Sequence, residues 1–185
     1  MTDSLVVDKW CFGVPTIVSD TFRIVPLKTQ NGPIATTSEE CFSPFELSSP
    51  QEDANRKNLD LRLSETWESK IECMEANIIY WVSQDPVRYF NEALGEEEIQ
   101  ERFKSCLHKK GEYPANLRVK VQTKGACAAR YWSPDKQLIQ VPATHAGCTF
   151  KAKLLIKGLW FAESSWGVTI EATDLLIQNQ PACPF

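Results

Sequence analysis

The stretch Thr149-Phe150-Lys151-Ala152-Lys153-Leu154-Leu155-Ile156-Lys157-Gly158-Leu159-Trp160-Phe161 is a long strand-like segment, and it predicts a strongly curved β-sheet. Lysines and apolar residues alternate at its beginning, which places them on opposite faces of a strand. Gly158 interrupts its far end, where a curled sheet or a barrel corner has to bend or bulge. A short polar link, residues 162–165, then leads to a second long strand, predicted from Trp166 to Ile177.

Three shorter strands are predicted before this pair, near residues 117–122, 128–132 and 137–141. The segment Ser133-Pro134-Asp135-Lys136 has proline at the second position of a turn, so it is predicted to join two of these strands as a hairpin. Closer to the N-terminus, short apolar segments at residues 10–12, 16–18 and 22–25 are separated by turn residues and also predict strands. Leu59, Leu61 and Leu63 alternate with polar residues and predict one more strand.

Helices are predicted only in the middle of the chain. Ser64 is a good N-cap for a helix whose apolar residues recur at a spacing of three and four: Trp67, Ile71, Met74, Ile78 and Trp81. Asp85-Pro86 is predicted to start a short helix that reaches Leu94, and Glu96-Glu97-Glu98 to start another that carries Ile99, Phe103 and Leu107.

These patterns predict one α+β domain over residues 1–185, a size that can bury a proper core. It divides into N-terminal strands (1–63), a helical insertion (64–110), C-terminal strands (111–177) and a tail (178–185). A small barrel or strongly curved, mostly antiparallel sheet, with the helices packed on one side or end, satisfies this order of elements.

Composition is that of an ordinary globular protein, with 43% hydrophobic and 24% charged residues. No apolar run approaches the length of a membrane span, and Met1-Thr2-Asp3-Ser4 does not resemble the start of a secretory signal. The seven cysteines are odd in number, widely spaced and without a Cys-x-x-Cys pair, which argues against a disulfide framework and a zinc site. We therefore expect an intracellular, reducing compartment.

Motifs for catalysis are absent from the sequence. Neither a phosphate-binding glycine loop nor a Gly-x-Ser-x-Gly elbow is present, and two histidines are too few for the usual metal sites. A thiol enzyme would need a reactive cysteine in a positive environment, and only Cys127 and Cys148 lie in the basic region. His145 near Cys148 in a turn-like context is a weak candidate for a nucleophile pair. We therefore predict a non-enzymatic binding protein without a cofactor or metal.

Positive charge is concentrated between Tyr113 and Trp160. This stretch contains eight Lys or Arg residues and one Asp, which gives a local charge of +7 in a chain of net charge −4. A basic sheet surface with nearby aromatic residues is suited to a flexible polyanion, above all a single-stranded nucleic acid. The candidate nucleic-acid-binding residues are Arg118, Lys120, Lys124, Arg130, Tyr131, Trp132, Lys151 and Lys153. Trp132 is the first candidate for base stacking and Tyr131 the second, whereas Trp160 and Trp166 are assigned to the core.

Two other interpretations stay open. Alternating Lys/Val strands are also how any half-exposed sheet looks, so the lysine rows could be ordinary exterior. The acidic helical part and the aromatic content would equally suit a protein-interaction or structural module, such as a scaffold, without nucleic-acid binding. The pattern does not separate DNA from RNA, and an exposed edge strand could pair two copies as a homo-oligomer. No membrane partner is expected.

Several blocks of the sequence resemble one known family. They are Gly32-Pro33-Ile34-x-Thr36-Thr37, Ser43-Pro44-Phe45, Lys57-Asn58-Leu59-Asp60-Leu61-Arg62-Leu63, Tyr113-Pro114-x-x-Leu117-Arg118-Val119-Lys120-Val121, Lys157-Gly158-Leu159-Trp160-Phe161 and Trp166-Gly167-Val168-Thr169. In order and separation, over residues 30–177, they resemble the small OB-fold-like single-stranded-DNA-binding proteins of nucleocytoplasmic large DNA viruses and related algal elements. No single block is diagnostic, so the joint order carries the resemblance.

The resemblance implies an OB-like barrel interrupted by a helical insertion. It also implies sequence-nonspecific binding of single-stranded DNA during viral replication or recombination. For a viral protein, the expected location is the host nucleus or a cytoplasmic viral factory, and the structural alternative is a virion component. One departure concerns the C-terminus, which ends Gln178-Asn179-Gln180-Pro181-Ala182-Cys183-Pro184-Phe185 and has no acidic tail. Recruitment of replication partners through such a tail is therefore not expected.

Overall fold

The computed structural model describes residues 5–49, 55–109 and 111–181, and it shows a mostly β chain that forms two compact units. Unit 1 consists of residues 1–34, 69–106 and 156–169, and unit 2 of residues 35–68, 107–155 and 170–185. Twelve strands and three α-helices lie in the described part of the chain. Each unit is thus built from three separate segments of the chain, and the single-domain organisation stays a prediction.

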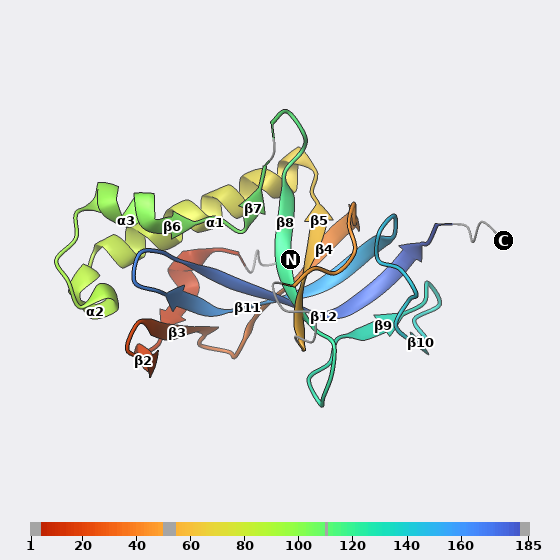
Figure 1. Ribbon diagram of the computed structural model, residues 1–185, viewed down its shortest axis with the longest axis horizontal. Helices are drawn as coiled ribbons and strands as arrows, with labels where there is room; N and C mark the ends of the chain where they lie inside the picture. The colour runs from red at the N-terminus through yellow and green to blue at the C-terminus, as the bar shows by residue number, and fades with distance from the viewer. Residues whose placement is uncertain (1–4, 50–54, 110, 182–185) are drawn as a thin grey trace. The chain divides into compact units, whose positions relative to one another are not determined.

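In unit 1, three strands pair antiparallel with β3: β1, β2 and the end of β11. The start of β12 pairs in parallel with β6. The bounds are β1 Trp10–Phe12, β2 Thr16–Ser19, β3 Phe22–Thr29, β6 Phe103–Lys104, β11 Thr149–Phe161 and β12 Trp166–Asn179, with a 3-10 turn η1, Val7–Lys9, before β1. The two long strands β11 and β12 have the predicted positions, and β12 extends two residues beyond its predicted end (Figure 1).

Helix α1, Glu65–Ser83, confirms the predicted cap and most of the predicted apolar face. The Ser64 hydroxyl accepts a hydrogen bond from the backbone N–H of Trp67, at 3.4 Å. Ile71, Met74 and Ile78 are buried as predicted, but Trp81 is 42% exposed and Val82 is buried in its place. The Trp81 ring instead lies 6.3 Å from the ring of Phe12.

The two short helices end earlier than the sequence predicts. Helix α2, Pro86–Phe90, has the predicted Asp85 cap, but it stops before Asn91, which has a left-handed backbone with φ of 60°. Helix α3, Glu96–Arg102, stops because Phe103 pairs with Trp166 in a strand and packs its ring 4.8 Å from the indole. Three residues after Phe103, the backbone N–H of Cys106 donates a hydrogen bond to the buried Glu75 carboxylate, at 2.7 Å. Leu107 lies in strand β7, so the helix predicted to carry it is wrong there.

In unit 2, five strands of the described residues close into a ring, in which β4 pairs with β5, β5 with β8, β8 with β12, β12 with β11 and β11 with β4. β4–β5 and β5–β8 are antiparallel, whereas β8–β12 is parallel. Three short strands extend the ring: β7 beside β8, β9 beside β12 and β10 beside β9. The remaining bounds are β4 Ile34–Phe42, β5 Arg56–Arg62, β7 Leu107–His108, β8 Asn116–Gln122, β9 Arg130–Trp132 and β10 Leu138–Ile139.

Strand alternation builds the core of this ring. Leu117, Val119 and Val121 on β8 and Leu59 and Leu61 on β5 are all 0% exposed. Their neighbours along each strand consequently point to the opposite side, away from the core. The predicted hairpin around Ser133–Lys136 is confirmed, since β9 and β10 pair antiparallel across it, although both strands are shorter than predicted. Among the described residues, no helix is both long and apolar enough to cross a membrane.

Gly158 lies where the backbones of β3 and β11 approach each other closely. A side-chain Cβ at this position would lie 2.4 Å from the carbonyl oxygen of Val25, which cannot move without disturbing β3. We therefore predict that Gly158→Ala lowers the free energy of unfolding by roughly 1–3 kcal/mol, the usual cost of overpacking, in urea denaturation. The control is Gly95→Ala, because nothing lies within 4 Å of the added atom there. Equal stability of the two variants would contradict the close approach.

Candidate nucleic-acid interface

The first basic surface of unit 2 lies on the outer side of two neighbouring strands, which run side by side in Figure 1. We call it the β5–β8 face and define it by Arg56, Asn58, Asp60 and Arg62 on β5 and Asn116, Arg118, Lys120 and Gln122 on β8. The register places them in cross-strand pairs: Arg56 with Gln122, Asn58 with Lys120, Asp60 with Arg118, and Arg62 with Asn116. Four cations and one acid therefore lie on these two strands, and Glu171 of the neighbouring β12, opposite Lys120, adds a second acid 4.0 Å from Arg56.

Two of the predicted site residues, Arg118 and Lys120, lie at the centre of this face. Arg118 is joined to Asp60 by two parallel hydrogen bonds of 2.8 Å, so much of its charge is already neutralised. Lys120 donates to the neutral Asn58 side chain at 2.6 Å. Burial lowers the pKa of Lys120, and the charges of Arg56 and Arg118 lower it further. An anion placed on the face would relieve this crowding of cations.

Arg62 and Phe42 belong to the same surface, although sequence reasoning did not select them. The Arg62 guanidinium carbon lies 5.5 Å from the centre of the Phe42 ring, which is 40% exposed. Arg62 Nε and the Asn116 side-chain oxygen are buried without a hydrogen-bond partner among the described residues. For Arg62, the alternation of Leu59, Leu61 and Leu63 is a sequence signal that could have identified it, because this alternation places Arg62 on the outer side of β5.

A second basic surface, the β9–β12–β11 face, is defined by Arg130 and Trp132 on β9, Asp174 and Leu176 on β12, and Lys151 and Lys153 on β11. Asp174 Oδ1 accepts hydrogen bonds from Arg130 at 2.7 Å and from the Trp132 indole N–H at 2.9 Å. The Arg130 guanidinium carbon also lies 5.6 Å from the centre of the Trp132 ring. Trp132 is therefore half-buried and fixed at its edge, with Arg130 over its ring.

Lys151 and Lys153 are exposed and alternate with the buried Ala152 and Leu154, as the sequence predicts. Neither lysine has an ion-pair partner among the described residues. Lys124 is also exposed, but it lies in the loop after β8 rather than on a strand. The structure thus brings six of the eight predicted residues onto two surfaces and leaves Lys124 and Tyr131 off both.

Tyr131 lies in the core of unit 2, where it is only 3% exposed. Its hydroxyl is 2.8 Å from His145 Nε2, and burial raises its pKa to about 12. The backbone N–H of His145 is in turn held by the Glu46 carboxylate at 3.0 Å. The geometry therefore supports a structural role for the Tyr131 ring, not stacking on a base.

Cys148, the cysteine nearest to His145 in sequence, is also buried. Its thiol donates a hydrogen bond to the Thr144 carbonyl oxygen at 3.2 Å. Burial raises the pKa of Cys148, and the charge of Glu46 raises it further. Both effects favour the thiol over the nucleophilic thiolate.

Comparison with known proteins identifies a shared fold. A single-stranded DNA-binding protein from bacteriophage Enc34, solved in complex with single-stranded DNA, superposes on this chain with a TM-score of 0.51. The match covers 93% of this chain and 98% of that one. The chain therefore shares its fold with this phage protein. Sequence identity is 8%, so the likeness concerns the fold alone. No family model and no curated protein sequence matches the chain.

Asp174 is predicted to stabilise unit 2 only while it is ionised. Burial alone would raise its pKa, but hydrogen bonds from Arg130, Trp132 and Thr173 outweigh this effect and lower it. Because the folded-state pKa is depressed, the stabilisation is present at neutral pH and is lost as the pH falls through that pKa. Asp174→Asn should therefore lower the unfolding free energy at neutral pH by about 1.5–3 kcal/mol, as for hydrogen bonds to charged groups.

Urea denaturation at neutral and acidic pH measures this difference, which should shrink as the solution is acidified. Asp135→Asn is the matched control, because it removes the same charge from the exposed turn between β9 and β10. A constant difference between wild type and Asp174→Asn at every pH would contradict the assignment.

Proposed function

We propose that the protein binds single-stranded DNA without sequence specificity, and that the strand crosses the β5–β8 face. The observation that carries the proposal is the position of this cationic face on the second and third strands of the ring. In OB folds, a five-strand architecture, the face of strands two and three binds oligonucleotides. The ring of unit 2, taken in chain order as β4, β5, β8, β11 and β12, supports an OB-like description.

The chemistry of the face fits a single strand. Arg62 and Lys120, which have no ion-pair partner among the described residues, can neutralise phosphates and release their counterions. The exposed Phe42 ring offers a surface on which an unpaired base can stack, whereas the bases of a duplex are already stacked. Phe45, 56% exposed in the segment between β4 and β5, adds a second ring close in sequence to the first. This arrangement does not require side chains that form hydrogen bonds with the edges of particular bases, so it binds without sequence specificity.

Biological context is a further part of the proposal and rests on the sequence resemblance. It comprises a role in viral DNA replication or recombination, an intracellular location, and assembly into homo-oligomers. RNA is the alternative polyanion, because backbone charge and base stacking are common to both nucleic acids. A protein-interaction module without nucleic-acid binding is the competing function, and its aromatic contacts would respond little to salt.

The first test is binding of a labelled oligo-dT by fluorescence anisotropy, with about 30 nucleotides to exceed the ~4–16 that one OB fold occupies. The logarithm of the affinity should fall linearly with the logarithm of the salt concentration, and duplex DNA should compete poorly. Lys120→Gln should weaken binding by about fivefold and reduce the salt slope by about 0.7, the value for one lost phosphate contact on a single strand.

Lys153→Gln provides the matched control, because it removes one lysine charge from the β9–β12–β11 face. If this variant loses affinity and Lys120→Gln does not, the strand lies on that other face. Absence of binding at low salt would overturn the function altogether and favour the protein-interaction module.

Binding should also depend on alkaline pH through Lys120. A nearby phosphate favours the charged lysine, so the pKa that is lowered in the free protein rises in the complex. Affinity should therefore fall as the pH rises through the lowered pKa, beginning below the ordinary lysine value of about 10.4. Anisotropy titrations across this range measure the effect, and Lys120→Arg, which keeps its charge, should show a smaller fall. An identical pH profile for the two proteins would contradict the contact.

A further inference from the structure

Unit 1 contains a pocket with a volume of about 280 Å³ that the proposed DNA-binding face does not use. Its walls come from the turn between β2 and β3, from α2, from the end of α3 and from the turn between β11 and β12. The volume lies just below the ~300–1,000 Å³ typical of pockets for drug-sized ligands. The pocket is therefore suited to a single long side chain.

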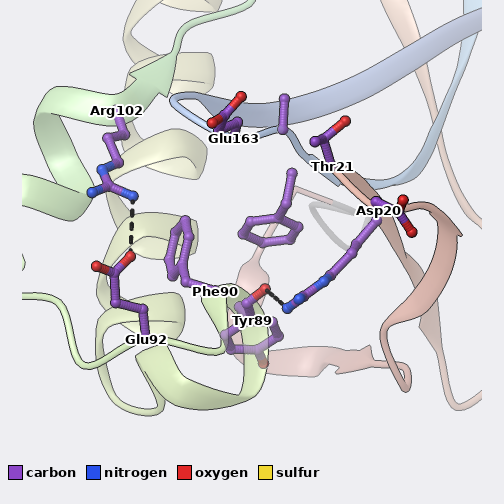
Figure 2. A pocket seen from close by; sticks show the side chains of 10 residues that line it. Asp20, Thr21, Tyr89, Phe90, Glu92, Arg102 and Glu163 are labelled. Carbon is purple, nitrogen blue, oxygen red and sulfur yellow. Dashed lines mark hydrogen bonds and ion pairs between the residues drawn. The ribbon is translucent and has the colours of Figure 1, made fainter.

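Aromatic rings form one wall of the pocket. Phe161 is stacked between Tyr89, at 5.7 Å, and Trp166, at 5.4 Å, so both faces of its ring are occupied. Phe90 meets Phe161 edge-to-face at 5.1 Å and remains partly exposed. In Figure 2 the Phe90 ring lies between the Arg102–Glu92 pair and Tyr89. Phe90 is thus the aromatic side chain best placed to contact an occupant.

The charges of the pocket favour a cation. Arg102 forms ion pairs with both Glu92 and Glu98, and Arg23 donates to the Tyr89 carbonyl oxygen at 3.4 Å. The lining residues Asp20 and Glu163 are exposed and have no ion-pair partner among the described residues. Arg102 is thus neutralised by its carboxylates, whereas the Tyr89 carbonyl leaves the charge of Arg23 uncompensated. With Asp20 and Glu163 ionised, the lining keeps two negative charges against one positive charge, a net −1.

The overall charge of unit 1 points the same way. Its three segments contain eight Lys or Arg and twelve Asp or Glu residues, a net charge of −4, whereas unit 2 contains twelve of each. The whole formal charge of the chain therefore belongs to unit 1. Such a surface repels phosphates and attracts basic partners over a distance.

We propose that this pocket binds an arginine side chain of a basic partner protein. The guanidinium is planar, stacks on an aromatic ring and forms paired hydrogen bonds with carboxylates, so Phe90, Asp20 and Glu163 together match its chemistry. The aliphatic part of the side chain would fill the remaining volume. The inference is independent of the DNA-binding proposal, because the pocket and the β5–β8 face use different residues in different units.

The test is an NMR titration of the full chain with a short peptide in which arginine alternates with serine, in the absence of DNA. The backbone amide signals of Asp20, Phe90 and Glu163 should shift. A peptide with citrulline, the uncharged analogue of arginine, should bind about tenfold more weakly, since it lacks the charge for the cation–π and ion-pair contacts. The double variant Asp20→Asn/Glu163→Gln should lose affinity by a similar factor.

The matched control is the double variant Glu96→Gln/Glu97→Gln, which removes the same charge from exposed positions of α3 outside the pocket. Equal losses in the two double variants would mean general attraction to an acidic surface and would overturn the site. Equal binding of the citrulline peptide would do the same. If oligo-dT rather than the arginine peptide shifts the Phe90 signal, the pocket is a base-binding site and the proposal is wrong.

Discussion

The closed ring of strands in unit 2 is the constraint on which its surfaces depend. Because β4, β5, β8, β12 and β11 pair in a circle, each of them has one side that faces the core and one that does not. The inner side of β8 is occupied by Leu117, Val119 and Val121. Because side chains alternate along a strand, Arg118 and Lys120 must lie on its outer side. A shift of one residue in this register would bury two charges, so packing of the core also fixes the positions of the cations.

Alternation explains how much of the site could be predicted from the sequence. The outward direction of Lys120, Lys151 and Lys153 is a property of one strand and was predictable from neighbouring residues. The partners of Arg118 and Trp132 were not predictable, because Asp60 lies 58 residues from Arg118 and Asp174 lies 42 residues from Trp132. Only the register of distant strands shows that Arg118 is paired and Lys120 is crowded. Tyr131 is a different case, because it lies between Arg130 and Trp132 on β9 and alternation alone directs it to the opposite side, into the core.

The fold itself was predictable where the local sequence pattern and the pairing with distant strands favour the same secondary structure. The long strands β11 and β12 satisfy both, and their positions were predicted almost to the residue. Helix α3 shows the opposite case. Its apolar spacing continues beyond Arg102, but Phe103 forms a strand with Trp166 and packs against its ring. This tertiary contact outweighs helix propensity, which is worth less than about 1 kcal/mol per ordinary residue.

The three-segment construction of each unit has a consequence for how the chain is made. Unit 2 cannot close its ring until residues 170–179 of β12 have left the ribosome, and unit 1 likewise needs residues 156–169. Both units must therefore wait for these late segments, and until then only part of their strand pairing, such as β1 and β2 with β3 and β4 with β5, can form. For the same reason, no single cut in the gene can yield one unit without the other.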